Sequence, residues 1–127
     1  MILRLTNKDK RFYQYMGKFF GSRIVQKETN DRIYDDSDKL WYIYIKNDTA
    51  LGFISTKENM IKNIYAINPE YVYKLLLEVQ KDIKIAPSTV TSAYLDIYKD
   101  FSFNITENDY KNFVTISTNI EKKVGEI

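Results

Sequence analysis

A β-hairpin is encoded by residues 40–55, which read LWYIYIKNDTALGFIS. Two runs of aromatic and β-branched residues, 40–45 and 50–55, flank the polar stretch 46–49. Such side chains favour strands, and a short polar stretch between two strand-like runs is typical of a hairpin turn. A third run of the same kind, 61–67, follows after another polar turn. We therefore predict a three-stranded antiparallel meander.

A helix over 69–84 is predicted directly after this meander, because Pro69 stands at a favoured early position. Its apolar stripe consists of Tyr71, Leu75, Leu76, Val79 and Ile83. Beyond it we predict a strand over 89–93, a short helix and two closing strands over 103–105 and 112–118. The apolar residues of the short helix are Tyr94, Ile97, Tyr98 and Phe101. The charged segment 121–127 is expected to fray.

On the N-terminal side, the sequence predicts a strand over 1–5 followed by a helix that Gly21 and Ser22 end. The apolar residues of that helix recur at helical spacing and are Tyr13, Met16, Phe19 and Phe20. The polar segment 23–39 predicts a second short helix and a solvated loop. The fold class is therefore α/β, with a mixed, largely antiparallel sheet flanked by helices.

The composition fits a single domain over 1–127. A chain of 127 residues with 44% apolar residues can bury a continuous core without disulfides or metals. It has no Cys and no His, which excludes disulfides, Cys or His zinc sites, thiol nucleophiles and imidazole bases. The remaining chemistry is acid–base work by carboxylates, Tyr or Lys, assistance from backbone amides, or a carboxylate-bound cation.

Charge and hydropathy restrict the partners and the location. A net charge of +2, from 19 basic and 17 acidic residues, predicts neither a polybasic nucleic-acid binder nor an acidic DNA mimic. No window reaches the roughly 18 consecutive apolar residues of a membrane span, and no leader pattern is recognised, so we expect a cytoplasmic protein without membrane contact. The abundance of Lys, Asn, Ile and Tyr matches AT-rich codons and suggests an AT-rich bacterium or one of its phages.

The order of elements, in about this length, resembles the Gcn5-related N-acetyltransferase (GNAT) fold. Hairpin residues 41–54 are similar to the family's second and third strands, and residues 64–71 (IYAINPEY) to its fourth strand and cofactor helix. Residues 97–103 (IYKDFSF) resemble its Leu-Tyr-Glu-Lys-Leu-Gly-Phe step, with Ser102 where the family favours Gly. The resemblance implies a GNAT-like domain over most of the chain.

The resemblance also implies acetyl-CoA as cofactor, at a site that this sequence builds incompletely. The family carries a Gln or Arg-x-x-Gly-x-Gly or Ala loop, whose backbone amides approach the pyrophosphate at a helix N-terminus. Here no glycine occurs between Gly52 and Gly125, and the loop is shorter by about one helical turn. The resemblance then places Ile67, Tyr73 and Lys74 beside the cofactor, and Lys74 alone offers a positive charge.

Tyr98 occupies the position where the family often has the general acid that reprotonates the departing thiolate. A tyrosine hydroxyl with a pKa near ~10 can do this. Glu58 and Glu70 are the carboxylates nearest the expected cleft and could relay a proton from an amine. Structural alternatives stay open, because Tyr98 is one of 11 tyrosines and could simply pack a helix onto the sheet. Glu58 and Glu70 could equally be solvated turn residues.

Two further patterns have ordinary surface explanations. The acidic run Asp31, Asp35, Asp36 and Asp38 could bind a divalent cation or a cationic partner, but its spacing does not match an EF-hand loop, and we expect no metal. Lysines interleaved with tyrosines, as in 42–46 and 71–74, could stack on and neutralise a nucleic-acid strand. Alternating faces of a strand and of a helix explain this pattern better.

Two functions of different classes follow. The first is a GNAT-like acyl-CoA N-acyltransferase-fold protein in which acetyl transfer to an amine is weakened or lost. The second is a non-enzymatic protein-binding module, a viral or accessory protein that uses an aromatic sheet surface. The partner is an acyl-acceptor amine in the first case and a protein in the second.

Overall fold

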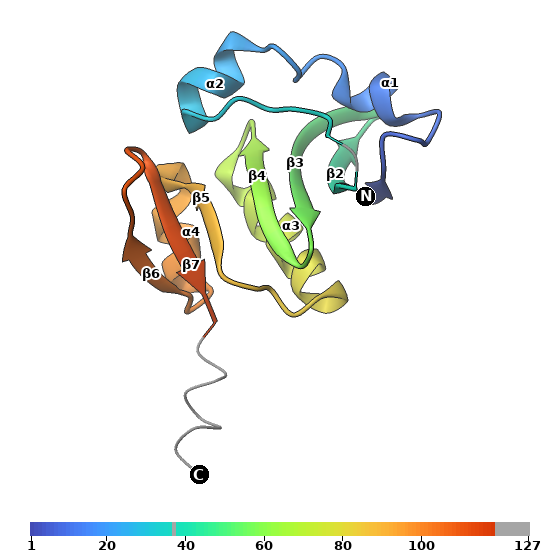
Figure 1. The fold of residues 1–127 in the computed structure, drawn as a ribbon. Coiled ribbons are helices and arrows are strands. Elements are labelled where there is room, and N and C mark those ends of the chain that lie inside the picture. Colours follow the sequence, from blue (N-terminus) through green and yellow to red (C-terminus); the bar gives the residue numbers. More distant parts are fainter. Residues whose placement is uncertain (37, 119–127) are drawn as a thin grey trace.

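The structure, a computed structural model, describes residues 1–36 and 38–118 (Figure 1). Its strands form a four-stranded sheet in the order β1-β2-β3-β4 and a three-stranded sheet in the order β5-β7-β6. The strands are β1 (Ile2–Leu5), β2 (Leu40–Lys46), β3 (Thr49–Lys57), β4 (Met60–Ala66), β5 (Ser88–Thr91), β6 (Asn104–Glu107) and β7 (Phe113–Ser117). The helices are α1 (Phe12–Met16), α2 (Arg23–Thr29), α3 (Pro69–Asp82), the 3₁₀ turn η1 (Ser92–Tyr94) and α4 (Leu95–Asp100). No helix within these described residues has the length and apolarity of a membrane span.

The predicted meander is confirmed. β2 pairs antiparallel with β3, and β3 with β4, so that Tyr42 lies opposite Ile54 and Ile54 opposite Ile64. Asn47 and Asp48 form the β2–β3 turn with φ angles of 52° and 59°. Tight two-residue hairpin turns require this left-handed backbone, and Asn and Asp tolerate it better than most residues.

Gly52 allows β3 and β4 to approach closely where β4 ends. It pairs with Ala66, and a Cβ added to Gly52 would lie 2.6 Å from the Ala66 Cβ. Because two carbon atoms cannot come so close, only glycine fits at this position. Ala66, the last residue of β4, is thereby held directly against β3.

β5 lies beside β4, although the two strands belong to different sheets (Figure 1). Near their starts, Ala86 N donates to Asn59 O over 2.8 Å, and Ile61 N donates to Ser88 Oγ over 2.9 Å. β4 and β5 therefore run in parallel from a common starting point.

Helices cover both faces of the four-stranded sheet. Alternate strand residues such as Tyr42, Ile54 and Ile64 form one core with α3, and this core continues onto the second sheet. Their neighbours Trp41 and Phe53 face the other way and form a second core with α1 and α2. The α3 residues buried in the first core are Val72, Leu75, Leu76 and Val79. Tyr71 and Ile83 of the predicted stripe are half-buried and pack at its margin.

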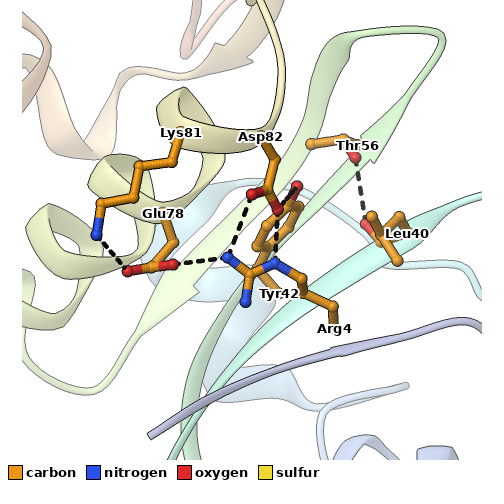
Figure 2. A network of polar contacts seen from close by, with 7 residues as sticks. All are labelled: Arg4, Leu40, Tyr42, Thr56, Glu78, Lys81 and Asp82. Atoms are coloured by element: carbon orange, nitrogen blue, oxygen red, sulfur yellow. Dashed lines mark hydrogen bonds and ion pairs between the residues drawn. The ribbon is translucent and has the colours of Figure 1, made fainter.

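Arg4 clamps the last turns of α3 to the first two strands (Figure 2). Its Nε donates to Asp82 Oδ2 over 2.5 Å, and its Nη2 donates to Glu78 Oε2 over 2.6 Å. The Tyr42 hydroxyl donates to the same Asp82 Oδ2 over 2.9 Å, and the Arg4 guanidinium lies 5.3 Å from the centre of the Tyr42 ring. Lys81 adds an ion pair to Glu78. The clamp thus joins β1, β2 and α3, which are far apart in the sequence.

Several element boundaries differ from those predicted. α1 already ends at Met16, and Phe19 and Phe20 lie in turns, in which Phe19 N donates to Met16 O and Ser22 N donates to Phe19 O. The Ser22 hydroxyl then accepts from Val25 N and caps α2. The strand predicted over 89–93 ends at Thr91, whose side chain accepts from Ala93 N and begins η1. α3 ends at Asp82, and β6 begins only at Asn104. The tail 121–127, expected to fray, lies outside the described residues.

Candidate functional site

The candidate site lies where β4 and β5 end. β4 ends at Ala66 and leads into α3, while β5 ends at Thr91 and leads into η1 and α4. Ala66 N donates to the hydroxyl of Tyr94, in η1, over 3.2 Å. At this end the two strands are therefore joined by a tyrosine side chain rather than by their backbones.

A buried set of hydroxyl groups holds the end of β5. The Tyr98 hydroxyl donates to Thr91 O over 2.6 Å, and the Thr91 hydroxyl donates to Thr29 O, at the end of α2, over 2.6 Å. Tyr98 is fully buried, and this burial raises the pKa of its hydroxyl well above the ordinary value. The hydroxyl bonds fasten α2 over the end of β5.

The first turn of α3 has its amides occupied from within the chain. Asn68 caps the helix: its side-chain oxygen accepts from Glu70 N over 3.0 Å, and its carbonyl accepts from Tyr71 N over 2.9 Å. Pro69 between them has no N–H. Helix N-termini bind anions through free N–H groups. Residues 69–71 offer none, and Glu70 adds a negative charge.

The structure separates the three residues predicted to lie beside the cofactor. Ile67 directly follows β4 and is 58% exposed. Tyr73 faces α4, with its ring centre 4.9 Å from that of Phe101. Lys74 points to another side of α3, where its Nζ lies 5.7 Å from the Tyr44 ring centre. Lys74 and Tyr44 both line a cavity of about 450 Å³ next to β1. Only Ile67 lies next to Ala66, and the cofactor roles of all three stay predictions.

Glu58 and Tyr98, the two predicted catalytic residues, are not brought together. Glu58 is exposed in the β3–β4 turn, before β4 begins, whereas Tyr98 is bonded at the far end of β5. The seven residues of β4 span about 20 Å, which is too far for one reaction centre. Glu70 is exposed and lies at the same end as Ala66. The catalytic roles of these residues stay predictions.

Three of the four acidic residues between 31 and 38 are bonded to side chains of the chain itself. Asp31, Asp35 and Asp36 are bonded in turn to Asn63, Tyr13 and Lys39. Lys39 is only 7% exposed and also donates to Asn63 Oδ1 over 3.2 Å. These contacts tie the loop before β2 to the sheet. Within the part of the chain that the structure describes, no group of three or more His, Cys, Asp or Glu residues could hold a metal ion.

Solved structures share this arrangement of elements. ElaA from Escherichia coli superposes with a TM-score of 0.61 at 12% identity, over 93% of this chain and 99% of its own. A putative GNAT-family acetyltransferase from Bacteroides thetaiotaomicron superposes with a TM-score of 0.56 at 17% identity, over 99% of this chain and 92% of its own. The N-acetyltransferase PseH from Campylobacter jejuni, in complex with acetyl coenzyme A, superposes with a TM-score of 0.51 at 14% identity, over 91% of this chain and 96% of its own. This chain has the GNAT fold. By sequence it matches no protein-family model and no curated protein.

The GNAT fold predicted from the sequence is thus confirmed, and one local feature fits it well. Ser102, where the family favours Gly, has a φ of 60°, in the region that glycine adopts most readily.

The sequence reasoning missed the position of Tyr94. Its spacing to Ile97 and Tyr98 predicted only that it belongs to a short helix after the strand. Helical spacing cannot distinguish such a residue from one that reaches across to the edge of another sheet.

Proposed function

We propose that this chain is a GNAT-fold relative of the acyl-CoA N-acyltransferases in which acetyl transfer to an amine is weakened or lost. The fold supports the relationship, since PseH, which shares it, was solved with acetyl coenzyme A. One observation above all supports the weakening. Asn68 occupies the N–H groups in the first turn of α3.

The residues at this helix end do not fit a pyrophosphate. Hydrogen bonds from N–H groups to an ionised acceptor are about twice as strong as neutral ones. Each N–H group that the chain already uses therefore removes a strong hydrogen bond that a pyrophosphate could have accepted. Pro69 has no donor, Asn68 takes two, and the Glu70 carboxylate repels a phosphate. Lys74 is directed toward Tyr44 instead. No step of acetyl transfer is assigned to these residues.

Calorimetric titration of the wild-type protein with acetyl-CoA tests the proposal. We expect a Kd weaker than about 100 μM, or roughly −5.5 kcal/mol. A Kd of about 1 μM or lower, roughly −8 kcal/mol, would contradict it. Asn68→Gly frees the Glu70 N–H and should tighten binding. Asn108→Gly is the matched control, because Asn108 caps Tyr110 N over 2.8 Å in a distant loop.

Two exposed tyrosines support the second candidate, a protein-binding module. Tyr13 is 53% exposed and Tyr34 54% exposed, and both line a groove of about 370 Å³ beside α1. The aromatic sheet surface expected from the sequence is not available, because helices cover it and Trp41, Tyr42 and Phe53 are fully buried. A Tyr13→Ala, Tyr34→Ala variant that folds but loses a partner retained by wild type would favour this function.

A further inference from the structure

Tyr94 connects the two sheets at the end where β4 and β5 finish. β4 is the outermost strand of its sheet, and the N–H of its last residue, Ala66, donates to the Tyr94 hydroxyl. An N–H at a sheet edge bonds to a neighbouring strand, a side chain, a ligand or water. In this chain the partner comes from the turn that follows β5.

At the start of β4 and β5 the two strands are connected by direct contacts, whereas at their other end a tyrosine side chain takes the place of such contacts. There Ala86 N bonds directly to Asn59 O, and only the short Ser88 side chain separates the backbones at Ile61. At the other end, the full length of a tyrosine side chain lies between β4 and the backbone of η1. Tyr94 is 7% exposed and belongs to the apolar cluster that contains Ala66 of β4 and Val90 of β5. Its side chain therefore reaches from η1 to the end of β4 inside a buried apolar cluster.

We propose that Tyr94 is an internal wedge, which fills a slot between the ends of β4 and β5 and occupies the Ala66 N–H that an extended, amide-bearing ligand chain would otherwise use. The inference rests on the proposed function, because it gives a second reason, at the same site, why this GNAT-fold chain binds acetyl-CoA weakly.

The ligand class follows from the donor and from the strands around it. A carbonyl of an extended chain is the natural acceptor for an edge-strand N–H, as in recognition by strand addition. An arm with successive amide groups, such as pantetheine, has this chemistry. Tyr94 competes with it by offering a hydroxyl oxygen to the same N–H.

Thr91 keeps the wedge in place, and burial keeps the Tyr94 hydroxyl neutral. The Thr91 side chain accepts from Ala93 N over 3.2 Å and fixes η1, while its hydroxyl holds α2 through Thr29 O. Burial raises the pKa of Tyr94 to about 12, so its hydroxyl is neutral near pH 7. A neutral hydroxyl is a suitable acceptor for Ala66 N–H and carries no charge into the apolar cluster.

The test uses S-acetylpantetheine, which has amide carbonyls and a thioester but no pyrophosphate. Binding is followed by NMR at the Ala66 amide. Tyr94→Ala removes the wedge and should bind the probe at least about tenfold more tightly than wild type, with a large shift at Ala66. Tyr110→Ala removes a tyrosine that is 68% exposed and should behave as wild type. A folded Tyr94→Ala variant that binds no better than wild type overturns the proposal.

Tyr94→Phe provides a test even if Tyr94→Ala does not fold. It keeps the ring in the slot and leaves Ala66 N–H without its partner. Hydrogen exchange at the Ala66 amide should therefore be about tenfold faster or more, with no gain in probe affinity. Unchanged exchange at Ala66 would show that the hydroxyl does not hold this N–H. A large gain in affinity would show that the ring does not fill the slot. Either result overturns the wedge.

The failure of this inference differs from the failure of the proposed function. Micromolar binding of acetyl-CoA by wild type contradicts the proposed function. The phosphate-free probe does not involve the α3 N-terminus, so the Tyr94 variants report on the slot alone. If Asn68→Gly tightens acetyl-CoA binding while Tyr94→Ala leaves probe binding unchanged, the wedge is wrong and the proposed function stands.

Discussion

The two ends of the β4–β5 pair are closed in different ways. At the joined end, formed by Asn59, Ile61, Ala86 and Ser88, backbone groups and one serine connect the strands. At the parted end, between Ala66 and the turn after Thr91, the connection is the side chain of Tyr94. A backbone contact can be removed only by changing the path of the chain, whereas a side-chain contact is one substitution away. On the proposal above, the parted end, which one substitution at Tyr94 would open, is where a ligand chain would bind.

The largest expected effect comes from α3, which packs against β2, β3 and β4. Leu76 is fully buried there, so Leu76→Ala should lower the free energy of unfolding by about 2 to 5 kcal/mol. Its neighbour Leu77 is 48% exposed, so Leu77→Ala should change the free energy of unfolding by less than about 0.5 kcal/mol. Urea denaturation measures both. Equal effects of the two substitutions would mean that α3 does not pack on the sheet through Leu76.

The next effect should appear at the joined end. Ser88 is 2% exposed; its hydroxyl accepts from Ile61 N and donates to Ala86 O. Ser88→Ala leaves a buried N–H without a partner, which should cost about 1 to 3 kcal/mol of stability. Thr89→Ala, at an exposed position of the same strand, is the control. If both variants unfold at the same urea concentration, Ser88 does not hold the strands together.

Much of the fold could be predicted because its signals are local. Alternating aromatic and β-branched residues gave the meander, and Pro69 with the stripe through Leu76 gave α3. The error at Phe19 and Phe20 arose because side chains in consecutive turns can also recur every three or four residues. Burial of Lys39 was not foreseen, since it depends on Asn63 in a distant strand.

The candidate site was harder to predict because it depends on how two sheets lie side by side. The Asn68-Pro69-Glu70 sequence is a recognisable helix start, and it could have indicated the occupied amides. The separation of Glu58 from Tyr98 and the reach of Tyr94 depend on strand direction and sheet order, which side-chain periodicity does not contain. The cytoplasmic location and the phage or AT-rich bacterial origin stay predictions.

A smaller effect is expected from Tyr98→Phe at the parted end. The variant keeps the buried ring and loses the hydrogen bond to Thr91 O, so stability should fall by roughly 1 kcal/mol. Thermal denaturation and an acetylation assay with an acceptor amine should be run together. If Tyr98 were a general acid, turnover would fall about 10²-fold or more. A wild type that acetylates the amine, and a folded Tyr98→Phe variant that does not, would restore the catalytic role.

The smallest effect concerns the Arg4 clamp on α3. The Arg4 guanidinium, followed by the Tyr42 hydroxyl, holds the pKa of Asp82 below its usual value, and Lys81 with Arg4 does the same for Glu78. A lowered folded pKa stabilises the fold above the unfolded value of about 4, and this contribution is lost as the pH falls through the folded value. Because these groups are exposed, the contribution is small and screened by salt. Urea midpoints of wild type and Arg4→Gln should therefore converge in acid. A difference between the two proteins that persists in acid would instead mean that Arg4 stabilises mainly by packing on the Tyr42 ring.

Hydrogen exchange at the Ala66 amide provides a comparison with the parted end. Because its partner Tyr94 is not a carboxylate, the Ala66 amide should keep its protection in acid relative to neighbouring amides.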